Sequence, residues 1–262
     1  MRAADHLDSD KIKLNLKTKL IGRNVLVFKS TTSTNDIAVE YSKNKENDGL
    51  AIFAERQTAG RGRAGTKWYS RSGDSILVSI VLTECRCSGE LLSLACAVAT
   101  AEAIGAVGGK QAQIKWPNDI RLNDKKVAGI LLESRTNNGR TSYIVGIGIN
   151  CHQKRNRFPA DLQATATSID IESGSVCDRI SLSKRVLTSM EHWLETAENT
   201  GKKVTQRWRQ LSTQLGHRVT VVFNGRRFTG NCIGIDPEKG LILQLDSGGT
   251  RFFDGVHTTI VK

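Results

Sequence analysis

The feature that most constrains the fold of this chain is a change of pattern near Gly216. Before that residue, short runs rich in β-branched and aliphatic residues, which are typical of strands, are interrupted by longer segments with apolar residues at helical spacing. From Gly216 onward, the last 47 residues consist almost entirely of strand-like runs separated by turn signals, such as Asn224 followed by Gly225. We therefore predict an α+β fold, with a mixed sheet and helices packed against it, followed by a small C-terminal β-barrel.

The predicted elements divide the chain into three parts. These are an N-terminal extension at residues 1–20, a main domain at residues 21–215 and the small β-barrel domain at residues 216–262. In the main domain, strands are predicted at residues 25–28, 50–54, 76–82, 126–133 and 143–149. Helices are predicted at residues 33–45, 90–107, 181–200 and 202–214. The helix at residues 90–107 is expected to bury one largely apolar face.

The charge of the chain narrows the range of partners. Lysine and arginine outnumber aspartate and glutamate by 38 to 26, which gives a net charge of +12 and a pI near 9.6. Such a balance suits a nucleic acid, a small anionic substrate or an acidic protein partner. The densest basic run, residues 56–71, contains no acid and is rich in glycine, so it indicates a loop rather than a basic recognition helix.

Membrane and secreted proteins are not expected. No run approaches the ~20 apolar residues of a membrane helix, and the first twenty residues lack the apolar core of a secretion signal. Six cysteines without a CxxC, together with five scattered histidines, fit neither a zinc site nor a dense disulfide framework. We therefore expect a cytoplasmic protein with reduced, mostly buried thiols. Cys85 and Cys87 flank a cation, Arg86, which leaves a redox role open.

The segment AGRGRAGTKW, residues 59–68, combines backbone freedom with positive charge. Its glycines allow the backbone to approach a ligand closely, and the guanidinium groups of Arg61 and Arg63 suit carboxylates and phosphates. The spacing matches neither a nucleotide P-loop nor a dinucleotide GxGxxG fingerprint. A flexible basic surface loop is the alternative. We expect residues 60–66 to be mobile without a ligand, because ordering a glycine-rich loop of like charges is unfavourable.

The segment KWPNDI, residues 115–120, places a turn between two predicted short strands at residues 114–116 and 120–122. Pro117 restricts Trp116 to extended conformations, and Asn118 and Asp119 follow with an amide and a carboxylate. Asp119 is suited to orient an amine or a magnesium ion. An ordinary Asx turn without a binding role is the alternative.

Two further segments resemble strands that line a cavity. In KKVAGILLES, residues 125–134, Lys126 stands at the mouth of an apolar strand, and Gly129 indicates a close approach of another group. In VGIGIN, residues 145–150, Gly146 and Gly148 share one side of a strand that ends at Asn150. A lysine that only reaches water and a glycine face that only packs on a helix are the alternatives.

The segments together favour one kind of chemistry. They supply arginines, a lysine, one carboxylate and glycine clearances, but no Ser–His–Asp set, no metal-ligand cluster and no convincing Cys–His pair. Such a site favours positional and electrostatic catalysis between anions over nucleophilic catalysis by the protein.

In their order and spacing, GRGRxG…W, KWPND, KxAGILxE and GIGIN resemble the biotin protein ligases, also called biotin–[acetyl-CoA-carboxylase] ligases, over about residues 31–150. The resemblance implies a catalytic domain like that of class II aminoacyl-tRNA synthetases plus a small C-terminal barrel. It implies that biotin and ATP with Mg²⁺ give biotinyl-5′-AMP and pyrophosphate. A lysine of an acidic biotin carboxyl carrier domain then accepts the biotin.

The resemblance also assigns the biotin-binding residues. The ureido ring is assigned to Ser33, Thr34, Asn35 and Gln57. The carboxyl end is assigned to Arg61, Gly62 and Arg63, with Arg63 also retaining the adenylate, and Lys126 is assigned a place between the biotin carboxylate and the α-phosphate.

The remaining assignments concern the nucleotide and the acceptor. Trp68 is expected to stack on adenine, and Lys115, Asn118 and Asn150 are expected to contact the nucleotide or its metal. Asp119 is expected to assist the incoming lysine as a proton acceptor or orienting group. The catalytic residues implied in this way are Arg63, Asp119 and Lys126.

Departures from the family pattern and rival functions complete the predictions. Three residues differ from those often found in the family: Ala64, Thr66 and Arg71. They belong to the loop and not to the contact residues, so we expect them to affect the stiffness of the loop more than the activity. About 20 residues precede the first predicted strand, so a DNA-binding winged helix and specific DNA binding are not expected. A homodimer is compatible with the resemblance. The alternatives are a lipoate or octanoate ligase, a basic nucleic-acid-binding protein and a non-catalytic biotin-binding module.

Overall fold

A seven-stranded sheet forms the centre of the main domain in the computed structural model, which describes residues 5–137 and 139–261. Its strand order is β1-β2-β3-β7-β6-β5-β4. The strands are β1 (Val25–Phe28), β2 (Ala51–Ala54), β3 (Ser75–Leu82), β4 (Gln113–Lys115), β5 (Asp119–Leu122), β6 (Lys125–Asn137) and β7 (Arg140–Asn150). β1 and β2 pair in parallel and the other neighbours pair antiparallel, so the predicted mixed sheet is confirmed.

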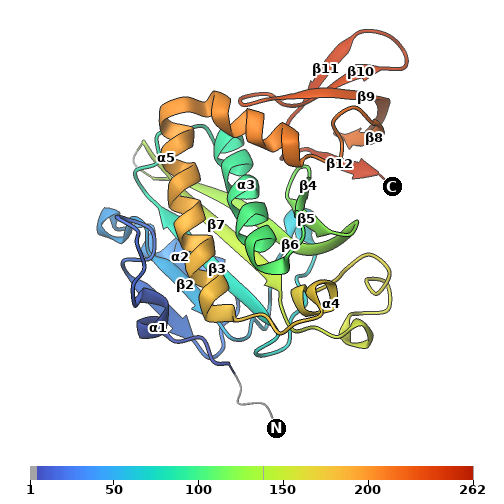
Figure 1. Ribbon diagram of the computed structural model, residues 1–262. Helices are drawn as coiled ribbons and strands as arrows, with labels where there is room; N and C mark the ends of the chain where they lie inside the picture. The colour runs from blue at the N-terminus through green and yellow to red at the C-terminus, as the bar shows by residue number, and fades with distance from the viewer. Residues whose placement is uncertain (1–4, 138, 262) are drawn as a thin grey trace.

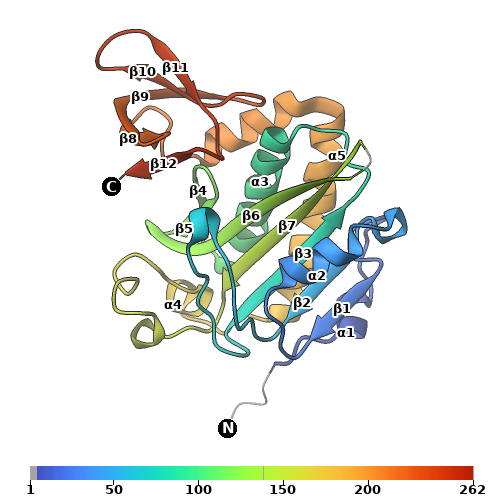
Figure 2. The same ribbon diagram turned by 180° about the vertical axis from the view of Figure 1, so that it is seen from behind.

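Helices cover both faces of this sheet. The helices are α1 (Ser9–Lys13), α2 (Thr34–Tyr41), α3 (Gly89–Gly108), α4 (Ile169–Ser173) and α5 (Arg179–Leu211). α3 and α5 pack side by side on one face (Figure 1), and α2 lies on the opposite face against β2, β3 and β7 (Figure 2). A side-chain cap begins each of these five helices; for example, Ser33 accepts a hydrogen bond from the Asn35 N–H and Ser88 accepts one from the Leu91 N–H.

Two predicted helix boundaries need correction. The helix predicted at residues 33–45 ends at Tyr41, where the Ser42 hydroxyl bonds back to the Val39 carbonyl, and a short 3₁₀ turn follows at Lys45–Asn47. The break predicted between the helices at residues 181–200 and 202–214 is present, because α5 is kinked at Thr200, whose φ and ψ are −151° and 74°, but its second part ends at Leu211 rather than at residue 214.

α3 is apolar on more than the one predicted face. Among the described residues, it is the one helix long and apolar enough to cross a membrane by length and composition, although polar residues such as Glu90 and Glu102 interrupt its apolar sequence. Its packing explains this composition, because α3 contacts α5 on one side and strands β4, β5 and β6 on another, and Leu92, Val98 and Ile104 are buried.

The C-terminal segment forms a second, five-stranded antiparallel sheet. Its strands are β8 (Arg218–Phe223), β9 (Arg226–Asp236), β10 (Gly240–Leu245), β11 (Thr250–Phe253) and β12 (Thr258–Val261), in the order β11-β10-β9-β8-β12. Asn224 and Gly225, both with positive φ, make the predicted hairpin turn between β8 and β9. Within the described residues no pairing joins the edge strands β11 and β12, so this is an open sheet where a small barrel was predicted.

The change of architecture falls between the end of α5 at Leu211 and the start of β8 at Arg218. The connecting residues remain bonded to the first sheet, because Ser212 forms an isolated bridge with Ile114, and the Gln214 side chain accepts a hydrogen bond from the Trp116 N–H at 2.9 Å. The second sheet therefore lies against the end of the main domain near β4 (Figure 1).

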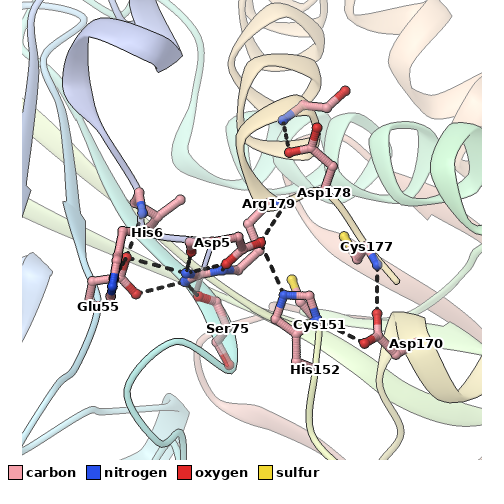
Figure 3. A network of polar contacts seen from close by, with 12 residues as sticks. Asp5, His6, Glu55, Ser75, Cys151, His152, Asp170, Cys177, Asp178 and Arg179 are labelled. Carbon is pink, nitrogen blue, oxygen red and sulfur yellow. Dashed lines mark hydrogen bonds and ion pairs between the residues drawn. The ribbon is translucent and has the colours of Figure 1, made fainter. Parts of the chain in front are cut away.

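The N-terminal segment is part of the core of the main domain. Leu7 and Ile12 are buried, and the start of α5 binds this segment through Arg179, whose side chain is 1% exposed. The Arg179 guanidinium forms ion pairs with Asp5 at 2.6 Å and with Glu55 at 2.8 Å (Figure 3). Burial alone would raise the pKa of Asp5, but the bonds from Arg179 and His152 outweigh it and hold that pKa below its usual value.

Candidate active site

A pocket of about 290 Å³ lies on the face of the large sheet that α2 covers. Eleven of the thirteen predicted site residues line it: Ser33, Thr34, Asn35, Gln57, Arg61, Gly62, Arg63, Trp68, Asn118, Asp119 and Lys126. They come from α2, β5, β6 and the two loops that follow β2 and β4, so segments separated by about a hundred residues converge here. Lys115 and Asn150 are not among the residues that line the pocket.

Glycines of β7 form the floor of the pocket. A Cβ atom on Gly146 would lie 2.3 Å from Oδ1 of Asn35, and one on Gly148 would lie 2.5 Å from the Trp68 ring. Both distances are too short for any side chain, so the predicted clearances exist and the side chains of Asn35 and Trp68 use them.

One end of the pocket is a neutral network of hydroxyl and amide groups. The Gln57 carbonyl oxygen accepts hydrogen bonds from the N–H and the hydroxyl of Thr34, at 2.7 and 3.0 Å. The Ser79 hydroxyl lies 2.7 Å from Oγ1 of Thr34 and 2.5 Å from Oδ1 of Asn35, whose amide donates to Glu133 at 2.7 Å. These contacts orient the side chains of Thr34, Asn35 and Gln57.

The basic loop is joined to the rest of the pocket through Arg61. Its guanidinium forms ion pairs with Asp36 at 2.6 Å and with Glu133 at 3.5 Å. The hydrogen bond to Asp36 raises the pKa of Arg61 above its ordinary value. The loop itself is closed by backbone bonds, from Gly62 N–H to the Thr66 carbonyl and from Trp68 N–H to the Gly60 carbonyl.

The opposite end of the pocket carries a cation and a carboxylate. Nζ of Lys126 lies 2.6 Å from Oδ1 of Asp119, and their side chains are 34% and 24% exposed. Lys126 is the second residue of β6, and its ammonium group also lies 5.6 Å from the Trp68 ring centre. The predicted cation at the mouth of an apolar strand is therefore present, with a carboxylate partner on the neighbouring strand β5.

Arg63 links the basic loop to the second sheet. Its guanidinium donates to the carbonyls of Gly255 and Thr258, the latter at 3.1 Å, and lies 3.5 Å from Oδ1 of Asn118. Burial lowers the pKa of Arg63 in spite of the nearby carboxylates. Glu90 holds the same C-terminal segment by accepting a hydrogen bond from the Gly255 N–H at 3.1 Å.

Asn150 is oriented into the protein. It is buried, its amide donates to the Thr167 carbonyl at 3.0 Å, and its oxygen accepts from Gln153 at 3.0 Å. Lys115 is half-buried on β4. The roles assigned to these two residues, contact with the nucleotide or its metal, stay predictions.

Several residues of the site were not foreseen. Ser79, Glu133 and Asp36 belong to the neutral end and the Arg61 ion pairs, while Glu90 and the carbonyls of the C-terminal segment surround Arg63. Ser79 and Glu133 could have been noticed in the sequence, since each is a polar residue within an apolar strand. The contacts of Arg63 with the C-terminal segment have no such signal, because backbone carbonyls have no sequence signature.

Comparison with known proteins identifies the class of this fold and site. Residues 27–150 match the model of the Biotin/lipoate A/B protein ligase family. The bifunctional ligase/repressor BirA of Bacillus spizizenii is 33% identical over 252 residues, which cover 94% of this chain and 77% of that protein. The biotin–[acetyl-CoA-carboxylase] ligase of Paracoccus denitrificans is 30% identical over 83% of this chain and 93% of its own length.

The fold of this chain is also similar to that of a solved structure. The biotin protein ligase from Aquifex aeolicus in complex with biotin and ATP superposes with a TM-score of 0.79 at 26% identity, covering 92% of this chain and 99% of that one. This chain belongs to the biotin protein ligase family. The predicted family is confirmed, and so is the α+β fold class with its mixed sheet and its separate C-terminal β unit.

Proposed function

We propose that this protein is an ATP-dependent biotin protein ligase, which forms biotinyl-5′-AMP and transfers the biotin to a lysine of a biotin carboxyl carrier protein. One observation carries the proposal: eleven predicted site residues converge on one pocket with a neutral polar end and a cationic end. Relatives named as biotin–[acetyl-CoA-carboxylase] ligases and a structural neighbour bound to biotin and ATP support it.

The two ends of the pocket fit the two ends of biotin. The uncharged ureido ring requires donors and acceptors without net charge, which the Thr34, Asn35 and Gln57 network offers. The carboxylate then points toward Lys126. Attack of this carboxylate on the α-phosphate of ATP brings two anions together, and the ammonium of Lys126 offsets their repulsion. Pyrophosphate leaves, and the mixed anhydride remains bound.

The second step transfers the acyl group. The amine of the acceptor lysine attacks the biotinyl carbonyl, the bond to AMP breaks, and the amine loses a proton. We assign to Asp119 the role of accepting that proton or orienting the incoming amine, and its position beside Lys126 at the cationic end supports this role. The acceptor is proposed to be an acidic carrier domain, since the net charge of +12 favours an anionic partner. The proposed location is cytoplasmic.

Magnesium is assigned to the ATP substrate. The described residues contain no group of three or more His, Cys, Asp or Glu side chains able to hold a metal ion, and the Asp119 carboxylate is already paired with Lys126. Mg²⁺ commonly binds through substrate phosphates with one or two carboxylates. These residues do not form a resident metal site, and no step of the proposed reaction depends on one.

Biotin-dependent exchange of pyrophosphate into ATP tests the first step directly. We expect exchange with biotin and not with lipoate or octanoate. Exchange that requires lipoate would instead indicate a lipoate ligase. The absence of exchange with any of these acids, together with steeply salt-dependent retention of nucleic acid on a filter, would favour the nucleic-acid-binding alternative.

A methyl group on the floor of the pocket should weaken biotin binding. Gly146→Ala places a Cβ where Oδ1 of Asn35 lies, and Asn35 is held by Ser79 and Glu133. Overpacking of this kind costs about 1–3 kcal/mol, or roughly 5- to 150-fold in affinity. The KM for biotin should rise by this factor. Gly105→Ala adds the same methyl group in α3 at ordinary contact distances, and its KM should stay unchanged.

The basic loop should become protected when the intermediate forms. Residues 60–66 contain three glycines and two arginines, so the anionic adenylate offsets both the entropy of ordering and the repulsion of like charges. Tryptic cleavage at Arg61 and Arg63 should slow when biotin and ATP are added together. Equal cleavage with and without these substrates contradicts the prediction.

Removing Arg63 should release the intermediate. Arg63→Gly deletes a guanidinium suited to the phosphate and detaches the loop from the carbonyls of Gly255 and Thr258. Adenylate synthesis should persist at a reduced rate, while added serum albumin is biotinylated more than by the wild-type protein. Arg71→Gly, an exposed position in the same basic run, is the control and should not increase albumin labelling. Synthesis without increased labelling would assign retention to Arg61 or Lys126.

A further inference from the structure

Cys85 and Cys87 carry chemistry that the proposed ligase reaction does not use. They lie in the irregular segment between β3 and Ser88, the N-cap of α3. Their sulfur atoms are 3.3 Å apart, within hydrogen-bond distance of each other, and both side chains are partly exposed. The other four cysteines are buried: Cys96, Cys151, Cys177 and Cys232.

The contact between the two thiols makes them chemically unequal. The hydrogen bond from Cys87 lowers the pKa of the Cys85 thiol, whereas the same contact and burial raise the pKa of Cys87. The thiolate is the form that attacks an oxidant, so Cys85 is the sulfur that reacts first. Cys87 then lies beside it as a resolving thiol. Burial raises the pKa of Cys96, the next cysteine in the chain.

The segment around the pair permits a disulfide. The S–S distance in a disulfide is about 2.05 Å, so the two sulfur atoms must approach by about 1.3 Å. Neither cysteine belongs to a helix or strand. The backbone N–H between them, that of Arg86, is bonded to the end of the Glu198 side chain at 2.9 Å rather than to a sheet ladder. A small change of backbone dihedrals therefore breaks no secondary structure.

We propose that Cys85 and Cys87 form a redox-modification site that hydroperoxides convert into a disulfide. The Cys85 thiolate attacks the peroxide, the O–O bond breaks, and Cys85 becomes a sulfenic acid with release of hydroxide. The Cys87 sulfur then attacks the sulfenic sulfur, so an S–S bond forms, the S–O bond breaks, and water leaves with the Cys87 proton. The two thiols lose two electrons, and hydrogen peroxide is reduced to two water molecules.

Tryptic cleavage after Arg86 allows this disulfide to be detected directly. Trypsin cleaves after Arg86, between the two cysteines, and yields the peptides of residues 72–86 and 87–110. The full-length protein is treated with a small excess of hydrogen peroxide, alkylated, denatured and digested. We expect the two peptides to remain linked, to have lost the mass of two hydrogen atoms, and to separate after treatment with dithiothreitol.

Two variants identify the partner of Cys85, because the second peptide also contains Cys96. Cys96→Ala should keep the linked peptides. Cys87→Ser should lose them and accumulate a Cys85 sulfenic acid that dimedone traps. Fragmentation of the linked wild-type peptides gives the same assignment without a variant.

Three outcomes would overturn the proposal. They are wild-type peptides that never link, a link that survives in Cys87→Ser, and a fragmentation pattern that places the bond at Cys96. None of these measurements depends on ligase activity, so the proposal stands or fails separately from the proposed function.

Discussion

Replacement of Lys126 by alanine should reduce the rate of adenylate formation by about 10²–10³-fold. Such a loss corresponds to about 2.7–4 kcal/mol, the range for removing one charged or polar contact made to a transition state. Lys126 stands at the cationic end of the pocket, 2.6 Å from Asp119. Its removal leaves the Asp119 carboxylate unpaired, facing the phosphates, so both the missing attraction and the new repulsion oppose the reaction.

Pyrophosphate exchange measures this effect, and the thermal midpoint of unfolding shows whether the fold is intact. Lys125→Ala is a matched control, because it removes the same charge from the neighbouring position of β6, which does not line the pocket. Normal exchange by Lys126→Ala, with an unchanged midpoint, would remove Lys126 from the proposed reaction. A double variant that adds Asp119→Asn should recover part of the lost rate of adenylate formation, since it removes the unpaired carboxylate.

The second large effect concerns stability. Replacement of Arg179 by methionine should lower the free energy of unfolding by about 3–5 kcal/mol, as is found when one partner of a buried ion pair is removed. Arg179 is 1% exposed and also donates to the Ser75 carbonyl at 3.0 Å, next to its bonds with Asp5 and Glu55 (Figure 3). Without Arg179, the Glu55 carboxylate, which is 9% exposed, remains buried without its cation.

Urea unfolding measures this loss. Arg218→Met is the control, because the Arg218–Asp246 ion pair is exposed, and its removal should leave the midpoint unchanged. Combining Arg179→Met with Glu55→Gln should cost less than the sum of the two single changes, since the double variant no longer buries the Glu55 carboxylate without its cation, and the more exposed Asp5 keeps its contact with His152. Equal losses for Arg179→Met and Arg218→Met would show that the buried network does not hold the N-terminal segment in place.

Arg63 connects the basic loop to a part of the chain that is distant in sequence, the C-terminal segment around Gly255 and Thr258. The basic loop of residues 60–66 is joined to the segment between β11 and β12 through this guanidinium, and Glu90 of α3 bonds to the same segment. The effects of Arg63→Gly should therefore include a weaker hold of the loop on the second sheet as well as a lost contact with the adenylate. For the same reason, we expect substitutions in the C-terminal segment to affect how well the protein retains the intermediate.

The sequence by itself determined the elements and the chemical composition of the site. The strands that later line the pocket are visible as apolar runs, and the clearances at Gly146 and Gly148 follow from the absence of side chains at these positions. The cation at the start of β6 and the turn at Asn118 and Asp119 are local features too. Each depends on residues close together in the chain, where dihedral preferences and periodicity act directly.

Only the tertiary structure decided which of these groups meet. The order β1-β2-β3-β7-β6-β5-β4 brings Ser79 of β3 and Glu133 of β6 to Asn35, and no local pattern specifies that order. Asn150 ends its strand as predicted but is oriented inward by Thr167, a residue of the following loop. The partners of Arg63 are backbone carbonyls of a distant segment, which any residue type supplies equally. Contacts of this kind depend on how the chain folds back on itself: residue identity supplies the groups, and the packing of distant segments decides which of them meet.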